Sequence, residues 1–352
     1  MVYSLNKKLA NLQAYDPIVG EYKIHLDANE SFININDVLS SKIFKEISKL
    51  QLNRYPDPYA DGVIQAFSAL YNIPDKYITA GNGSDELISI ITSCFLETND
   101  KILTLSPDFS MYGFYGSLYE LQVKTLEKEK DLSINVDKVI DYCNENHVKA
   151  LIFSNPCNPT SLGLCREDVI KLVSSVSSLV ILDEAYMDFW SESILDKIGD
   201  FDNLIILKTC SKAVGLAGVR LGFAVASEII TNALKAAKSP YNTDSISQAI
   251  GKCVLEEKEI LKSNLAKIIS SRNELYANIL DLSRKYSILE KVYETKTNFI
   301  FIKTIAASTI FNALLENSIA IRNMGNYIRI NAGNESENAE LLQILEEILK
   351  KL

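Results

Sequence analysis

The chain has 352 residues, of which 47% are hydrophobic and 23% charged, so it is long enough for two domains with a substantial core. Its net charge of −9 argues against a nucleic acid as the main partner, because binding nucleic-acid phosphates requires a basic surface. No segment reaches about eighteen consecutive apolar residues and the first residues carry no apolar signal sequence, so we expect a cytoplasmic protein without membrane contact. Six cysteines without a C-x-x-C pair and only two histidines leave no motif for a metal site.

Short apolar runs alternate with helical patterns over the first two thirds of the chain. The runs that we expect to form strands are residues 76–80, 101–106, 149–154, 179–183 and 204–209. Continuous apolar runs of this length are typical of parallel strands that helices cover on both faces. The pattern therefore predicts an α/β fold with a doubly wound, mostly parallel sheet.

The sequence pattern changes after about residue 248. A long charged helical pattern over 256–286 is followed by apolar runs at 298–303 and 327–332 and by a closing helix, which indicates a smaller α+β domain. We expect three parts: an N-terminal arm (1–30) that packs with the small domain or a partner subunit, a large domain (31–245) and a small C-terminal domain (246–352).

Polar residues follow the predicted strands, at the edge where open α/β sheets bind ligands. The first strand leads into "GNGSDE" (Gly81 to Glu86), whose backbone N–H groups at a helix start can bind a phosphate. The alternative is an ordinary glycine turn with Asn82 or Ser84 as the helix N-cap. Glu86 stands where a dinucleotide fingerprint needs glycine, and no G-K-[ST] follows, which counts against a nucleotide-binding protein.

Three further strand ends carry candidate chemistry. "NPCNPT" holds Asn158 between two Asn-Pro steps, or forms a simple turn. Asp183 ends an apolar strand, where a carboxylate requires a cation or hydrogen-bond donors unless it caps the next helix. Lys212 lies among small residues, where a partly desolvated amine can form a Schiff base, although most lysines in turns are solvated. With Tyr186 and Arg220, these residues match the phosphate, pyridinium, phenolate and aldehyde of pyridoxal phosphate.

Three of these stretches, "SNPCNPT", "LDEAYMDF" and "TCSKAVGLAGVRLGF", resemble the fold type I pyridoxal-phosphate-dependent aminotransferases. Within that family, the chain is most similar to the histidinol-phosphate aminotransferases. The stretches that carry this similarity are "IHLDANES", "NRYPDP", "GNGSDELI", "SPYNTDSISQAI" and "IRINAGNESEN". The resemblance extends from about residue 11 to the C-terminus.

The resemblance implies an aminotransferase of histidine biosynthesis. It would convert L-histidinol phosphate and 2-oxoglutarate to imidazole acetol phosphate and L-glutamate, by ping-pong transamination through an aldimine on Lys212. The implied partners are a small-molecule amino donor, a 2-oxo acid and a second copy of the chain, in a homodimer that shares its active sites across the interface.

The family also implies a role for each matched residue. Lys212 would carry the cofactor and shuttle the proton, Asp183 would pair with the pyridinium nitrogen, and Tyr112 would stack on the ring. Asn158 and Tyr186 would hold the phenolate oxygen. The phosphate would be bound by the backbone amides of Ser84 and Asp85, by Thr209, Ser211 and Arg220, and by Tyr55 of the second subunit. The substrate would be bound by Arg322 and Arg329, with Tyr15 and Asn29 lining the same pocket.

The chain departs from the family pattern at three places. The usual glycine after "NPT" is Ser161, the proline that commonly follows the Asn29-Glu30 segment is missing, and only six residues separate Arg322 from Arg329. The first affects the conformation of the Asn158 loop, and the other two affect the substrate side.

Three alternatives share the cofactor. An L-threonine-O-3-phosphate decarboxylase and an aromatic amino-acid aminotransferase would use the same cofactor-binding residues. A non-catalytic pyridoxal-phosphate-binding regulator belongs to a different class and would be expected to carry an added DNA-binding module or to lack the lysine. Neither feature is found in the sequence.

Overall fold

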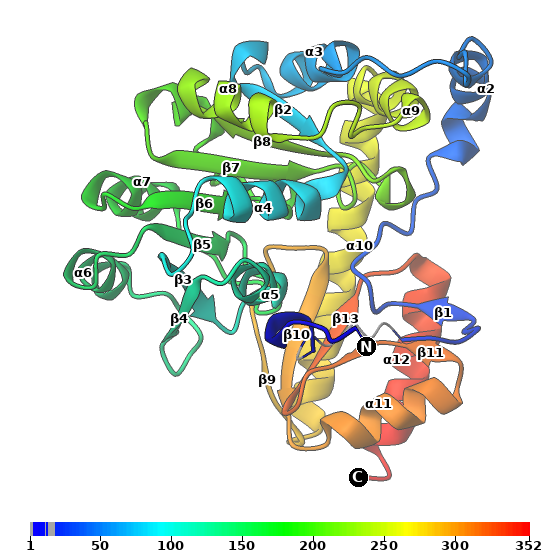
Figure 1. The fold of residues 1–352 in the computed structure, drawn as a ribbon. Coiled ribbons are helices and arrows are strands. Elements are labelled where there is room, and N and C mark those ends of the chain that lie inside the picture. The colour runs from blue at the N-terminus through cyan, green and yellow to red at the C-terminus, as the bar shows by residue number, and fades with distance from the viewer. Residues whose placement is uncertain (1–2, 11, 13–17) are drawn as a thin grey trace.

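The larger part of the chain is built on a seven-stranded sheet of order β2-β8-β7-β6-β5-β3-β4 (Figure 1). This computed structural model describes residues 3–10, 12 and 18–352, so Tyr15 lies outside the described residues. Strand β8 is antiparallel to β2 and β7, and the other neighbouring strands are parallel. The predicted doubly wound, mostly parallel sheet is confirmed. The strands are β2 (Ile78–Gly81), β3 (Lys101–Ser106), β4 (Gln122–Glu127), β5 (Ala150–Ser154), β6 (Leu179–Asp183), β7 (Leu204–Thr209) and β8 (Gly222–Ala226).

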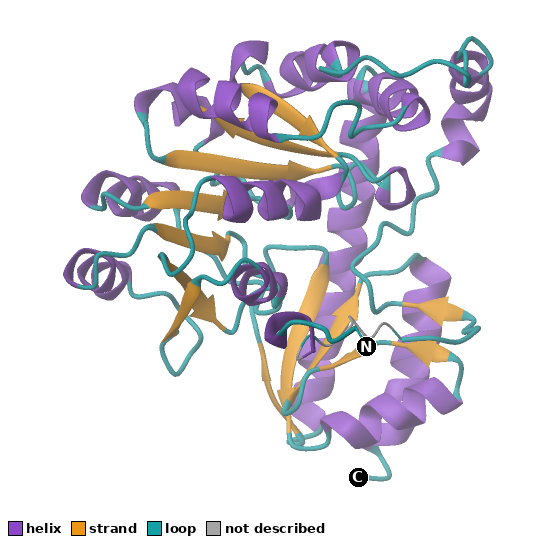
Figure 2. Cartoon of the chain, in the orientation of Figure 1, coloured by secondary structure: helices purple, strands orange, loops and turns teal. Residues whose placement is uncertain are grey.

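Helices cover both faces of this sheet (Figure 2). Residues such as Ile181 and Ile205 pack on one face against α4 (Gly83–Cys94), α5 (Met111–Leu118) and α8 (Glu228–Ala237). Their neighbours Leu182 and Ile206 point to the other face and pack in a second cluster. That cluster contains residues of α2 (Asn36–Ile47), α3 (Asp61–Tyr71), α6 (Val136–Glu145), α7 (Arg166–Ser175) and α9 (Ser245–Leu255). Burial on both faces explains why the strands are apolar throughout.

The smaller domain contains a four-stranded sheet of order β12-β13-β10-β9. A separate apolar cluster joins this sheet to α11 (Ala307–Glu316) and α12 (Glu335–Leu349). Ile24 and Leu26 are buried in the same cluster, and β1 (Ile24–His25) pairs in parallel with β11 (Ile319–Ala320). Residues 24–26 therefore pack on the small domain. The sheet strands are β9 (Leu289–Val292), β10 (Phe299–Thr304), β12 (Arg322–Asn323) and β13 (Tyr327–Asn331).

Helix α10 (Lys258–Lys285) connects the two domains and runs alongside both in Figure 1. Its Leu261 packs in the core of the large domain, whereas Leu275 and Ile279 pack in that of the small domain. At 1.5 Å per residue, a helix of 28 residues spans about 42 Å, which is enough to reach both cores. The passage between the domains thus lies within α10 and not at the predicted residue 245, because α9 still packs in the large core.

Within the described part of the chain, no helix is long and apolar enough to cross a membrane. The same residues contain no group of three or more His, Cys, Asp or Glu side chains arranged to hold a metal ion.

Gly222 pairs with both Gly81 of β2 and Thr209 of β7, and a side chain there would collide with the start of α4. A Cβ atom on Gly222 would lie 2.5 Å from the Ser84 nitrogen and 2.6 Å from the Gly83 carbonyl carbon. We expect Gly222→Ala to lower the free energy of unfolding in urea by about 1–3 kcal/mol, because backbone atoms cannot move aside cheaply. Gly218→Ala is the matched control, since its Cβ would meet nothing within 4 Å. An equal loss in both variants would contradict this prediction.

Candidate active site

The carboxyl ends of β5, β6 and β7 lie side by side at one edge of the sheet. Ser154 pairs with Asp183, and Asp183 pairs with Leu207. The loops that follow these strands therefore meet there and bring together Asn158, Asp183 and Lys212. Because β8 is antiparallel, it begins at this same edge, so Arg220 arrives beside them.

The Lys212 amine lies between the N-terminal segment and Tyr186. Its Nζ donates a hydrogen bond to the Ala28 carbonyl oxygen at 3.0 Å and is 5.8 Å from the centre of the Tyr186 ring. The Tyr186 hydroxyl accepts a hydrogen bond from Asn29 Nδ2 at 2.8 Å, and both side chains are buried. The structure thus brings together Lys212, Tyr186 and Asn29.

Asp183 is a buried carboxylate, 5% exposed, and two donors hold it. The Tyr112 hydroxyl donates to Oδ2 at 2.8 Å, and the Ala185 N–H donates to Oδ1 at 3.0 Å. Burial raises the pKa of Asp183 to about 6, although both hydrogen bonds act to lower it. A cationic group beside this carboxyl would favour its ionised form.

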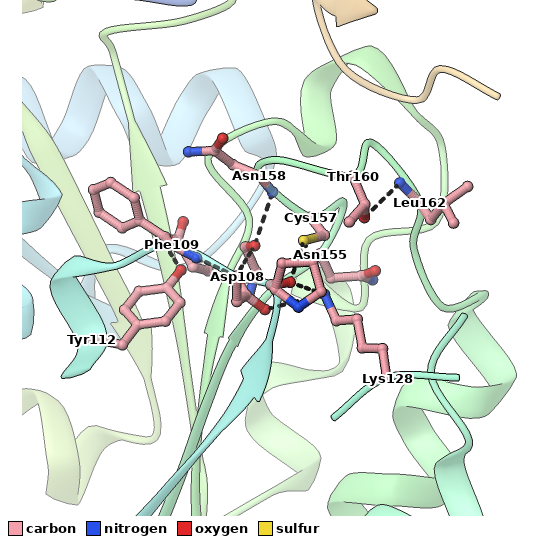
Figure 3. Close-up of polar contacts among 12 residues, drawn as sticks. Asp108, Phe109, Tyr112, Lys128, Asn155, Cys157, Asn158, Thr160 and Leu162 are labelled. Atoms are coloured by element: carbon pink, nitrogen blue, oxygen red, sulfur yellow. Dashed lines mark hydrogen bonds and ion pairs between the residues drawn. The ribbon is translucent and has the colours of Figure 1, made fainter. Parts of the chain in front are cut away.

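Tyr112 has a different place from the one predicted. We expected its ring to stack on a cofactor, but it is 1% exposed and its hydroxyl is bonded to Asp183, so neither face of the ring is open. Phe109 lies beside it, with ring centroids 5.5 Å apart and planes at 84° (Figure 3). Sequence reasoning missed Phe109, whose only signal is its position in "PDF" at the carboxyl end of β3.

Several donors form an anion cradle, made of Gly83–Asp85, Thr209, Ser211 and Arg220. Helix α4 begins there without a side-chain cap on its first N–H groups. Gly83 has a φ of 82°, and a Cβ on it would come within 2.7 Å of the Arg220 guanidinium. The Thr209 hydroxyl donates to Ser211 Oγ at 3.0 Å, and both residues are buried. Arg220 also approaches the Asp85 carboxylate at 3.4 Å.

Arg329 of β13 faces the Asn158 loop across the domain boundary. Its NH1 donates to Asn158 Oδ1 at 2.5 Å, and its NH2 donates to the Asp27 carbonyl oxygen at 2.7 Å. Arg322 of β12 is its partner in the strand register. The two predicted substrate arginines therefore lie on adjacent strands, and the short connection between them is a strand reversal.

The buried ammonium group of Lys128 joins the turn at Asp108 to the loop that carries Asn158 (Figure 3). Lys128 Nζ donates to the Pro107 carbonyl oxygen at 2.7 Å and to Cys157 Sγ at 3.0 Å, and lies 3.5 Å from the Asp108 carboxylate. Asp108 in turn accepts from the Ser154 hydroxyl, and Ser154 Oγ accepts from the Asn158 N–H at 3.1 Å. The network joins the Phe109 turn to the Asn158 loop. Lys128 directly follows β4, a strand without a clear apolar run in the sequence.

A second ion cluster lies under the opposite face of the sheet. Lys208 Nζ is 2.8 Å from the Asp188 carboxylate and 3.9 Å from that of Glu184, and Tyr71 donates to Asp188 at 3.1 Å. Glu184 and Lys208 are the chain neighbours of Asp183 and Thr209, so they point to the other side of β6 and β7. Their pairing holds together the two strand ends that present the site.

The comparisons with known proteins agree with this geometry. The model of the family "Aminotransferase class I and II" matches residues 22–345. The chain belongs to this family. Among its curated relatives, the histidinol-phosphate aminotransferase of Clostridium novyi is 40% identical over 96% of this chain and 95% of its own. That of Pyrococcus furiosus is 32% identical over 98% of each chain. The fold matches the histidinol-phosphate aminotransferase of Sinorhizobium meliloti, solved with pyridoxal-5'-phosphate, with a TM-score of 0.87, 20% identity and coverage of 99% and 98%.

The raised pKa of Asp183 makes a prediction for the protein without cofactor. A carboxyl whose pKa rises from 3.8 to about 6 on folding stabilises the fold at about pH 4 and loses that contribution as the pH rises through about 6. We expect Asp183→Asn, which stays neutral, to be more stable than the unmodified chain at pH 8 by up to about 3 kcal/mol, and to differ little at pH 4. Urea denaturation at both pH values measures this difference. Asp202→Asn, at an exposed position, is the control, and a difference for Asp183→Asn that does not depend on pH would contradict the prediction.

Proposed function

We propose that the protein is a pyridoxal-phosphate-dependent aminotransferase that transfers an amino group between L-histidinol phosphate and 2-oxoglutarate. The observation that carries this proposal is the match at 40% identity over nearly the whole chain, combined with the convergence of Lys212, Asp183 and Arg220 at one sheet edge. A cytoplasmic location agrees with the proposal.

The residues at this edge fit pyridoxal phosphate. The anion cradle supplies helix N–H groups, two hydroxyls and a guanidinium for the phosphate, and the glycines at 83 and 222 leave its backbone accessible. The buried Asp183 carboxylate would face the ring nitrogen, and the Lys212 amine would bind the aldehyde. When bound, the cofactor supplies an electron sink for charge that develops at the substrate Cα.

The remaining residues would orient the ring and move the proton. Phe109 would take the stacking role that Tyr112 does not fill, and Tyr112 would hold the Asp183 carboxylate in place. Asn158 and Tyr186 would bind the phenolate oxygen. The Lys212 amine would take the proton from the substrate Cα, because a general base must reach that atom from a fixed position.

Arg329 and Arg322 would select the substrates. A guanidinium binds carboxylate and phosphate oxygens in pairs, which suits one substrate with a phosphate and another with two carboxylates. The L-threonine-O-3-phosphate decarboxylases would need the same groups, so the assay must separate the two reactions.

The cofactor assignment is tested with the purified protein and added pyridoxal phosphate. We expect an absorption band at the edge of the visible range, and its loss in Lys212→Ala, because only a lysine amine can bind the aldehyde covalently here. A colourless protein at saturating cofactor would contradict the assignment.

The substrate is tested by mixing the protein with histidinol phosphate and 2-oxoglutarate, from which we expect glutamate to form. Carbon dioxide released from threonine phosphate would instead favour the decarboxylase.

A homodimer is part of the proposal. Four large apolar side chains between residues 44 and 59 are exposed, which is typical of a surface that another chain covers. They are Phe44, Leu52, Tyr55 and Tyr59. Tyr55 is 81% exposed, and its ring stacks on Tyr241 with centroids 4.5 Å apart. The fixed ring would present its hydroxyl to the phosphate in the second subunit.

Mixed dimers test whether Tyr55 acts across the interface. We expect Tyr55→Phe homodimers to bind the cofactor at least about 10-fold more weakly, since a hydrogen bond to a charged group contributes about 1.5–3 kcal/mol. In a dimer of one Lys212→Ala protomer and one Tyr55→Phe protomer, the only intact lysine would face the intact tyrosine. Titration of the absorption band should then give unmodified affinity. Weak binding in the mixed dimer would place Tyr55 in its own subunit's site.

A further inference from the structure

Ser161 has a backbone conformation that favours glycine. Its φ is 62°, in the left-handed region, and its side chain is 0% exposed. The chain thus places a side chain where glycine would be unstrained. The contacts of the hydroxyl group therefore indicate what the side chain does.

The hydroxyl joins the two domains. Ser161 Oγ lies 2.7 Å from Thr297 Oγ1 and accepts a hydrogen bond from the Lys296 N–H at 2.8 Å. Thr297 is also 0% exposed, and its carbonyl oxygen accepts from Arg272 NH1 of α10 at 2.7 Å. Lys296 and Thr297 lie in the turn before β10 of the small domain, whereas Ser161 lies in the loop after β5 of the large domain. We call these three residues, Ser161, Lys296 and Thr297, the interdomain clasp.

The loop that carries Ser161 also carries Asn158, three residues earlier. Asn158 accepts the hydrogen bond from Arg329, and Arg329 pairs in register with Phe301 of β10. The loop therefore contacts the small domain at two points, one just before β10 and one in its neighbour β13. The clasp includes none of the proposed substrate-binding groups, yet it fixes how far Asn158 lies from Arg329.

We propose that Ser161 is a positioning residue for substrate binding. Its hydroxyl holds the Asn158 loop against the small domain, so that Arg329 presents its guanidinium to the carboxylate or phosphate of the substrates. The inference rests on the proposed function, in which both substrates carry such a group. Lys212, Asp183 and the anion cradle lie on other segments, so the clasp would affect the cofactor only through Asn158.

Two substitutions separate the hydroxyl from the backbone. S161G and S161A both remove the hydroxyl, but only glycine relieves the left-handed strain. In both variants we expect the KM for each acidic substrate to rise about 3- to 10-fold through the lost buried hydrogen bonds, with kcat changed less than about 2-fold. Cofactor affinity should change less than the KM, because Asn158 is the one proposed cofactor-binding residue on this loop. The melting temperature of S161G should exceed that of S161A, so that KM and stability move independently.

Trp190, the only tryptophan, gives a second readout that needs no cofactor. Lys296 Nζ lies 4.2 Å from the centre of its ring. Because the Lys296 N–H is bonded to Ser161, loss of the hydroxyl should shift the tryptophan emission of the apoprotein in S161G. T297V should reproduce both the higher KM and the shift. The double variant S161G/T297V should add little to either change, as expected of two residues in one contact.

Two results would overturn the positioning role: S161G with unchanged KM and emission, or S161G and T297V effects that simply add. Failure of the unmodified chain to transaminate any amino donor would overturn the proposed function instead. In that case the emission of S161G and T297V would still decide whether the clasp holds the domains together.

Discussion

The register of the parallel strands is the constraint on which the site depends. Ser154, Asp183 and Leu207 lie opposite one another across β5, β6 and β7, and the loops that leave these positions carry the proposed chemistry. A slip of one residue in β6 would turn Asp183 to the other face of the sheet. The apolar residues on both faces resist such a slip, because each would lose its own buried cluster.

Alternation along β6 and β7 separates the proposed functional charges from the structural ones. Asp183 and Thr209 point toward the face that holds Tyr112, whereas Glu184 and Lys208 point to the opposite face and pair there. Buried ions are stable only when they are paired and hydrogen-bonded. Lys208 supplies that pairing for Glu184, the neighbour of Asp183, and Lys128 supplies it for Asp108, the neighbour of Phe109.

The sequence predicted five of the seven strands of the large sheet and missed β4 and β8. Residues 101–106, 179–183 and 204–209 have the predicted bounds because each is a strong apolar run. Strand β4 contains only partly buried and exposed residues, so it gave no clear apolar run. Strand β8 is buried and apolar, but it begins inside a glycine-rich motif that obscured its start. The predicted position of Tyr112, stacked on the cofactor ring, differs from the observed one for another reason. Phe109 and Tyr112 are both aromatic and three residues apart, and only the packing shows which one is bonded to Asp183.

Three residues around the proposed site keep a left-handed backbone without being glycine: Asn29, Ser161 and Arg220. In each case the side chain contacts a different segment, since Asn29 bonds Tyr186, Ser161 bonds Thr297, and Arg220 approaches Asp85. A strained backbone persists only where the surrounding structure holds it. The departure from glycine at Ser161 therefore follows the same pattern as the two residues that the family resemblance identified.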